Sequence, residues 1–150
     1  KIIKEIYYLS EKNNCEVIIP LDFAVSESIN EEKNFKYVEK VEDNEIILDI
    51  GPKTVEKINK IIDISKTVLW NGPAGYFENQ NFSKGTILIA KKISDNTNKN
   101  SLISIVGGGD TISAIKNNAS HLNFTHLSTA GGAFLEYIEG KNLPGIEVLK

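Results

Sequence analysis

Apolar residues recur along this chain with two different spacings. Near the start, Ile2, Ile6 and Leu9 fall on one face of a helix, as residues three or four apart do. Elsewhere, short apolar runs bounded by Gly, Pro, Asn or Asp are typical of buried strands. The two spacings predict helices over residues 2–13, 54–64, 83–94, 111–117 and 132–139, and strands over residues 16–19, 45–50, 67–70, 101–106 and 125–128.

Strands that alternate with helices predict an α/β fold, with three layers (α/β/α) around a mainly parallel sheet. Helices should cover both faces of that sheet, with right-handed crossovers between the strands. Residues 22–44 interrupt the alternation, because they are charged and irregular, with room for one short strand over residues 35–41.

Composition limits the class of protein. A chain of 150 residues is long enough for one domain with its own core, and a net charge of −3 argues against nucleic acid as the main partner. No apolar run has the length of a membrane span, and the start lacks a signal-peptide pattern, so we expect a cytoplasmic protein without a membrane partner. Cys15 is the only cysteine, and its apolar surroundings predict a small buried side chain rather than a disulfide. Because the chain begins at Lys1 and contains no Met, we expect it to be a fragment.

Residues 106–111 (Val-Gly-Gly-Gly-Asp-Thr) join a predicted strand to a predicted helix. Glycines at such a junction let backbone N–H groups approach a phosphate at the helix N-terminus, and Asp110 could add a ligand for Mg²⁺. The alternative is a tight turn in which Asp110 only caps the helix. The segment is not a Walker A loop, because no Lys follows the glycines. It is not a dinucleotide fingerprint either, because Ile112 stands in place of the third Gly.

Three other predicted strands also end in glycine-containing polar segments. These are residues 49–52 (Asp-Ile-Gly-Pro), 71–75 (Asn-Gly-Pro-Ala-Gly) and 128–132 (Ser-Thr-Ala-Gly-Gly). Since the carboxyl ends of parallel strands meet at one edge of a sheet, all four segments should lie along that edge. Together they favour one extended, phosphate-bearing ligand. The alternative is that they are only short turns between strands and helices.

These segments resemble, in the same order, the motifs of the phosphoglycerate kinase family. Residues 68–78 (VLWNGPAGYFE) resemble its WNGP-x-G-x-FE segment, and residues 107–111 match its GGGDT. Residues 49–52 match its DIGP, residues 128–133 resemble its STGGGA, and residues 135–149 resemble its C-terminal LEGK-x-LPG segment. The resemblance covers nearly the whole chain.

The resemblance implies a Rossmann-like C-terminal nucleotide-binding domain that is incomplete at its N-terminus, with the N-terminal substrate domain absent. It implies a monomeric glycolytic enzyme that transfers a phosphoryl group reversibly between 1,3-bisphosphoglycerate and MgADP, giving 3-phosphoglycerate and MgATP. Such chemistry needs alignment and charge neutralisation more than a reactive side chain. Because the basic groups that bind phosphoglycerate would belong to the missing sequence, we expect this chain alone to be inactive.

By position, the resemblance assigns residues to the phosphate end of the ligand. Asp110 would hold Mg²⁺, and Thr111 would contact the nucleotide phosphates. The amides of Gly131 and Gly132 would face the transferring phosphoryl group and stabilise its developing charge. The backbone around the phosphates would be that of Gly107, Gly108 and Gly109.

The resemblance also implies a nucleoside end. Glu78 would accept hydrogen bonds from the ribose hydroxyls, and Asn71 would reach the ribose–phosphate region. Pro73, Gly75 and Tyr76 would line the nucleoside pocket.

Several of these residues have a purely structural alternative. Glu78 could be a solvated carboxylate, and Asn71 could be a turn residue. Trp70 and Phe77 are predicted to be core residues rather than adenine stackers. Asp49 could fix the turn that follows it rather than contact a ligand.

Two positions depart from the family pattern. Ala130 replaces the first glycine of the run after Ser-Thr, which would strain the backbone if that position requires a positive φ. Tyr76 stands where a small aliphatic residue is commoner, and it could narrow the nucleoside pocket.

Two other functions compete with the kinase. One is a non-catalytic nucleotide-binding module. The other is a dinucleotide-dependent oxidoreductase, which is disfavoured because no G-x-G-x-x-G follows a predicted strand.

Overall fold

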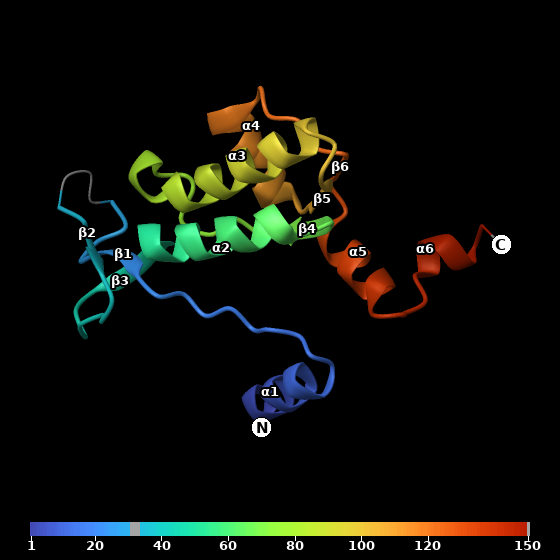
Figure 1. Cartoon of the computed structure of the whole chain (residues 1–150), viewed down its shortest axis with the longest axis horizontal. Helices are drawn as coiled ribbons and strands as arrows, with labels where there is room; N and C mark the ends of the chain where they lie inside the picture. The colour runs from blue at the N-terminus through green and yellow to red at the C-terminus, as the bar shows by residue number, and fades with distance from the viewer. Residues whose placement is uncertain (31–33, 150) are drawn as a thin grey trace.

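The residues that the structure describes form two three-stranded sheets, with helices packed mainly on one of them (Figure 1). The structure is a computed structural model, and it describes residues 1–30 and 34–149; residues 31–33, within the segment expected to be irregular, lie outside the described residues. In chain order the elements are α1 (Ile2–Lys12), β1 (Phe23–Ser26), β2 (Lys36–Val38), β3 (Ile46–Ile50), α2 (Pro52–Ile64), β4 (Thr67–Asn71), the 3₁₀ helix η1 (Gln80–Phe82), α3 (Lys84–Asn98), β5 (Ile103–Gly107), α4 (Gly109–Ala119), β6 (His126–Ser128), α5 (Gly131–Ile138) and α6 (Pro144–Glu147).

The second sheet has the order β4-β5-β6 and is parallel throughout, which confirms the predicted α/β class. Leu69 of β4 lies opposite Ile105 of β5, and Val106 lies opposite Leu127 of β6. Helices α3 and α4 connect these strands, as the alternation of apolar runs and helical segments predicts. The carboxyl ends of all three strands therefore meet at one edge of the sheet.

The first sheet has the order β2-β1-β3 and is antiparallel. The sequence did not predict β1, because its short apolar run stands in an otherwise charged segment. Since β3 pairs with β1, its end at Ile50 does not lie on the edge of the parallel sheet. The expectation that four strand ends share one edge is thus wrong for residues 49–52 and holds for the other three.

Helices α2, α3 and α4 bury their apolar sides against one face of the parallel sheet. Ile62 of α2 meets Ile89 and Ile93 of α3 in one cluster, and Trp70 of β4 packs against it. Trp70 also packs against a second cluster around Val106, so it is a core residue as predicted. On the other face of the same sheet, 41% of Leu69 is exposed.

Helix α1 forms as predicted, but none of its residues is buried. Figure 1 shows it apart from the sheets, joined to β1 by an extended segment. The strand predicted over residues 16–19 is wrong, since this segment pairs with no strand in the described chain. Cys15 is exposed, so the prediction of a buried thiol is also wrong. Both errors have one cause, because an apolar run is buried only where a partner covers it.

The described residues include no helix that combines the length and the apolarity needed to cross a bilayer.

Burial on α3 gives a direct test of this packing. Ile93 is fully buried, whereas 47% of Leu88 on the same helix is exposed. We expect Ile93→Ala to lower the free energy of unfolding by about 2–5 kcal/mol, because it leaves a cavity under the sheet. Leu88→Ala is the control and should change it by less than about 1 kcal/mol. Urea denaturation measures both, and equal effects would contradict the packing described.

Candidate functional site

The three parallel strand ends enclose a cleft of about 380 Å³. It is lined by Asn71, Gly72, Pro73, Gly108, Gly109, Asp110, Thr111, Thr129, Gly131 and Gly132. The structure thus brings together most of the residues predicted to meet phosphate. Gly107 lies beneath them as the buried last residue of β5.

The turn from β5 into α4 depends on Gly108. Its φ of +93° lies in the region that favours glycine, and its carbonyl accepts the first helical hydrogen bond, from Ile112 N, at 3.1 Å. Its N–H donates to Ser128 O at 3.1 Å, which ties this turn to β6. Helix α4 therefore begins at the strand edge, with its N-terminus at the cleft.

Three backbone segments approach one another closely around Asn71. A Cβ on Gly108 would lie 2.8 Å from Asn71 Oδ1, and a Cβ on Gly131 would lie 2.9 Å from the Cα of Gly108. Asn71 Oδ1 is buried, and it has no hydrogen-bond partner in the described structure. A buried acceptor without a donor is costly, so this atom is suited to accept from a ligand group.

Thr111 has a structural role that its sequence motif does not predict. Its side chain is fully buried, and its Oγ1 accepts a hydrogen bond from Gly72 N at 2.8 Å. The same turn is held from the other side, where Trp70 Nε1 donates to Gly72 O at 2.8 Å. Thr111 therefore braces the segment after β4, whether or not it also contacts phosphate.

The departure at Ala130 carries no strain. Its φ is −80°, so the position does not require glycine. The N–H of Ala130 donates to Ser128 Oγ at 3.2 Å, and α5 begins at the next residue. The loop therefore reaches α5 without backbone strain at Ala130, and Gly131 and Gly132 form the first two residues of that helix.

Two helix N-termini, those of α4 and α5, border the cleft. Their first-turn N–H groups and the aligned peptide dipoles favour an anion there. A Cβ on Gly109 or on Gly132 would meet nothing within 4 Å, so the cleft is open at both residues. Asp110 is exposed beside them.

The cleft contains one carboxylate rather than a complete metal site. No three His, Cys, Asp or Glu side chains gather to hold a metal among the residues that the structure describes. A single carboxylate fits Mg²⁺, which commonly binds one or two carboxylates, the phosphates of its ligand and several waters. The residues present therefore fit a magnesium ion that arrives with a phosphate ligand.

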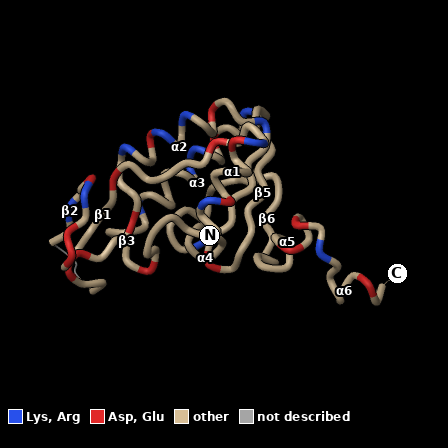
Figure 2. The backbone as a smooth tube through the Cα atoms, turned by 90° about the horizontal axis from the view of Figure 1, so that it is seen from below, with Lys and Arg blue, Asp and Glu red and all other residues tan. Residues whose placement is uncertain are grey.

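Lysine is the only basic residue type apart from histidine, because all 17 Lys and Arg residues are lysines. Figure 2 shows lysines along α2 and α3. None of them lines the cleft between the described strand ends. Backbone amides and helix dipoles thus supply its attraction for anions.

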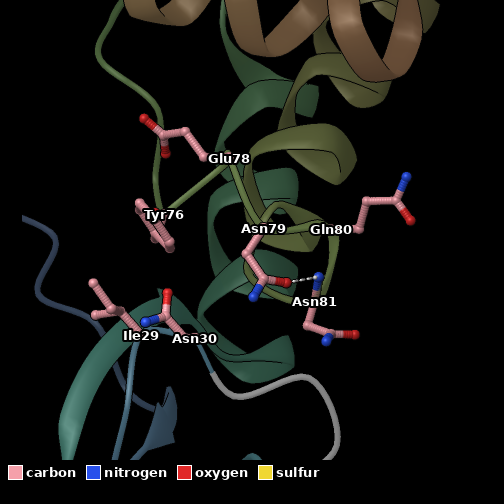
Figure 3. A pocket seen from close by; sticks show the side chains of 7 residues that line it. All are labelled: Ile29, Asn30, Tyr76, Glu78, Asn79, Gln80 and Asn81. Carbon is pink, nitrogen blue, oxygen red and sulfur yellow. Dashed lines mark hydrogen bonds between the residues drawn. The ribbon is translucent and has the colours of Figure 1, made fainter.

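The residues predicted to contact the nucleoside are spread over three clefts. Pro73 borders both the first cleft and a second one of about 350 Å³, which Gly75 and Tyr76 also line. Tyr76 and Glu78 border a third cleft of about 650 Å³, with Asn30 on its other side (Figure 3). Glu78 is exposed. The first and second clefts share Pro73 as a lining residue, and the second and third share Tyr76.

The segment between β4 and η1, residues 72–79, carries these nucleoside residues, and we call it the β4–η1 loop. Tyr76 N donates to Leu48 O of β3 at 2.7 Å. Ala74 N donates to Thr86 Oγ1 of α3 at 2.9 Å. No sequence pattern predicts the roles of Leu48 and Thr86, because these contacts join segments that are distant along the chain.

Asp49 contacts the first turn of α3. Its side chain is 2% exposed, and Oδ2 accepts from Gly85 N at 2.8 Å. Burial raises the pKa of Asp49 to about 6, although its two backbone hydrogen bonds and Lys84 favour the ionised form. The sequence suggested that Asp49 could fix the turn after it, but the N–H of Gly51 in that turn donates to Asp22 O, and Asp49 instead contacts a helix that begins 35 residues later.

The fold and the cleft define an α/β protein with a glycine-lined anion cleft at the carboxyl ends of its parallel strands. The model of a known family, described as phosphoglycerate kinase, matches residues 1–141 of the chain. The chain belongs to the phosphoglycerate kinase family.

Individual relatives agree with this assignment. The phosphoglycerate kinase of Orientia tsutsugamushi (strain Boryong) is 48% identical over 142 residues, which cover 91% of this chain and 34% of the relative. That of Wolbachia sp. subsp. Brugia malayi (strain TRS) is 43% identical over 155 residues, which cover 99% of this chain and 38% of the relative. The chain thus spans little more than a third of the length of the curated relatives it matches.

Solved structures give the same result. The structure of phosphoglycerate kinase from Coxiella burnetii matches with a TM-score of 0.85 and 36% identity, over 98% of this chain and 38% of that one. The enzyme from Pyrococcus horikoshii OT3 matches with a TM-score of 0.77 and 30% identity, over 98% of this chain and 36% of that one.

The raised pKa of Asp49 predicts how stability depends on pH. Between its ordinary value of 3.8 and about 6, the folded chain retains a proton that the unfolded chain has released. The Asp49 contribution to the free energy of unfolding should therefore decrease as pH rises through this range, by about 3 kcal/mol at most, and stay constant above it. Urea denaturation at several pH values measures this. In Asp49→Asn the decrease should be absent, and an unchanged pH profile would contradict the assignment.

Proposed function

We propose that this chain is part of the C-terminal, nucleotide-binding domain of a phosphoglycerate kinase, and that its strand-end cleft binds the phosphates of MgADP or MgATP. The observation that carries the proposal is the meeting of two helix N-termini with an unpartnered buried acceptor, Asn71 Oδ1, in one glycine-lined cleft. Family membership supplies the reaction, which is reversible phosphoryl transfer between 1,3-bisphosphoglycerate and ADP. Membership is also the only support for a glycolytic, cytoplasmic monomer.

Each end of the nucleotide has a proposed set of contacts. The amides of Gly108 and Gly109 would bind the nucleotide phosphates at the start of α4, with Thr111 holding the turn beside them. The amides of Gly131 and Gly132 would face the transferring phosphoryl group at the start of α5, where fixed dipoles stabilise developing charge.

Asp110 would bind Mg²⁺, which neutralises phosphate charge when it is present. Asn71 would contact the ribose–phosphate region, with its buried oxygen next to both glycine turns. Pro73, Gly75 and Tyr76 would line the nucleoside, and Glu78 would accept from the ribose hydroxyls.

A non-catalytic nucleotide-binding module is the second candidate. It is favoured by one observation, namely that no lysine lines the cleft within the part of the chain that the structure describes. Phosphoryl transfer normally uses cationic groups to neutralise the transition state. We therefore propose that this chain binds nucleotide but does not catalyse phosphoryl transfer by itself.

Nucleotide binding can be measured directly through Trp70, which adjoins Asn71 and donates to Gly72 O. We expect titration with MgADP to change its fluorescence in a saturable way. Asp110→Asn should weaken binding by about tenfold, because it removes the charged ligand for Mg²⁺. Asp95→Asn, which neutralises an exposed carboxylate on α3, is the matched control and should bind as the parent does. A folded chain that binds no MgADP, or equal effects of both variants, would reject the site.

Turnover is tested separately with 3-phosphoglycerate and MgATP, using a coupled assay for ADP. We expect no rate above that of the buffer, because the described cleft offers backbone amides but no basic side chain to the transferring group. ADP formation that co-purifies with the chain as an activity, and that is lost in Asp110→Asn, would contradict this expectation.

A further inference from the structure

Asp49 joins the antiparallel sheet to α3 through a single side chain. Oδ1 accepts from Ile50 N at 2.9 Å in β3, and Oδ2 accepts from Gly85 N at 2.8 Å in the first turn of α3. Both carboxylate oxygens are therefore used, and the side chain is almost completely buried.

The β4–η1 loop lies directly against this carboxylate. A Cβ on Gly75 of the loop, or on Gly85 of α3, would overlap Asp49 Oδ1. The loop is also bonded to the residue before Asp49 and to the residue after its partner Gly85. Tyr76 N donates to Leu48 O, and Ala74 N donates to Thr86 Oγ1. Its position thus depends on how β3 and α3 are held together.

We propose that ionised Asp49 is a positioning residue for the β4–η1 loop, which it fixes by holding β3 and α3 together without contacting a ligand. An ionised carboxylate can accept both N–H groups. In a protonated acid the hydroxyl oxygen is a weaker acceptor, and in an amide the NH2 group is a donor, so either form weakens or loses one of the two bonds. The expected effect on nucleotide affinity rests on the proposed function, whereas the effect on the loop does not.

The charged and titratable groups that interact with Asp49 are Lys84 on α3 and Tyr37 on β2, and Tyr37 is also close to the charge of Asp22, before β1. Lys84 favours the ionised carboxylate, but burial outweighs it and raises the pKa of Asp49 to about 6. Burial, followed by the charges of Asp49 and Asp22, raises the pKa of Tyr37. Tyr37 therefore stays neutral where Asp49 titrates. As pH falls through about 6, Asp49 gains a proton while it is still buried. The cost of burying its charge is then removed, which raises the free energy of unfolding, but one of its two N–H bonds weakens, so the loop should loosen locally within the folded chain.

The first experiment follows backbone amide NMR signals of the unsubstituted chain from pH 4.5 to 8. We expect the Gly85, Ala74 and Tyr76 amides to shift with one shared midpoint near pH 6. The Gly72 amide, which is held by Thr111 of α4, is the internal control and should lack this midpoint. Loop signals that do not follow the Gly85 midpoint would overturn the proposal, and this test needs no substitution.

The second experiment uses variants at pH 7.5. We expect Asp49→Asn to speed hydrogen exchange at the Ala74 and Tyr76 amides by about tenfold, because their supporting elements separate more easily. Asp22→Asn is the matched control, since Asp22 is also buried and accepts from backbone N–H groups, but at the start of α2. Unchanged exchange in Asp49→Asn, or equal changes in both variants, would overturn the proposal.

The third experiment links the loop to ligand binding. The ratio of MgADP dissociation constants, Asp49→Asn over parent, cancels any titration of the nucleotide itself. We expect this ratio to be about ten at pH 7.5 and to fall below about two at pH 5, where the parent has also lost its carboxylate charge. A ratio that does not change with pH would overturn the proposal. A parent that shows the shared NMR midpoint but binds no MgADP would reject the proposed function while supporting Asp49 as the positioning residue of the loop.

Discussion

Around Asn71 there is no space for a side chain on the two glycines that face it, and the candidate site depends on this close approach. The ends of β4, β5 and the loop after β6 meet there, with Gly131 packed on the Cα of Gly108. A methyl group at either glycine would push the strand ends apart and separate the two helix N-termini. Close packing of backbone is therefore what gathers the amides into one anion-binding cleft.

Two buried carboxylates join the antiparallel sheet to the helices beside this cleft. Asp22 accepts from the N–H groups of Lys53 and Thr54 at the start of α2, and Asp49 accepts from Gly85 at the start of α3. Hydrogen bonding outweighs burial at Asp22 and lowers its pKa, whereas burial outweighs hydrogen bonding at Asp49 and raises its pKa. The pKa values of these two carboxyls, which both contact helix N-termini, are thus shifted in opposite directions. Only the pKa of Asp49 is moved toward neutral pH.

Local patterns predicted most of the elements but not how far each is buried. The helices α1 to α5 were predicted because their apolar residues recur at helical spacing, and β3 to β6 because their short apolar runs end at Gly, Pro, Asn or Ser. The short strand β1 was not predicted, because three apolar residues in a charged segment show no periodicity. A strand was wrongly predicted over residues 16–19, because their apolar run is typical of a strand but has no partner strand in the described chain.

The sequence by itself determined the α/β class, the family and the glycine-rich strand ends, because each is encoded in neighbouring residues. Tertiary structure alone decided that residues 49–52 leave the parallel sheet, that Thr111 bonds to Gly72, and that Ala130 needs no positive φ. It also decided that Asp49 caps a helix far along the chain. The physical reason is that strand pairing, burial and hydrogen bonds between distant segments depend on which partners meet in space, and local spacing does not specify them.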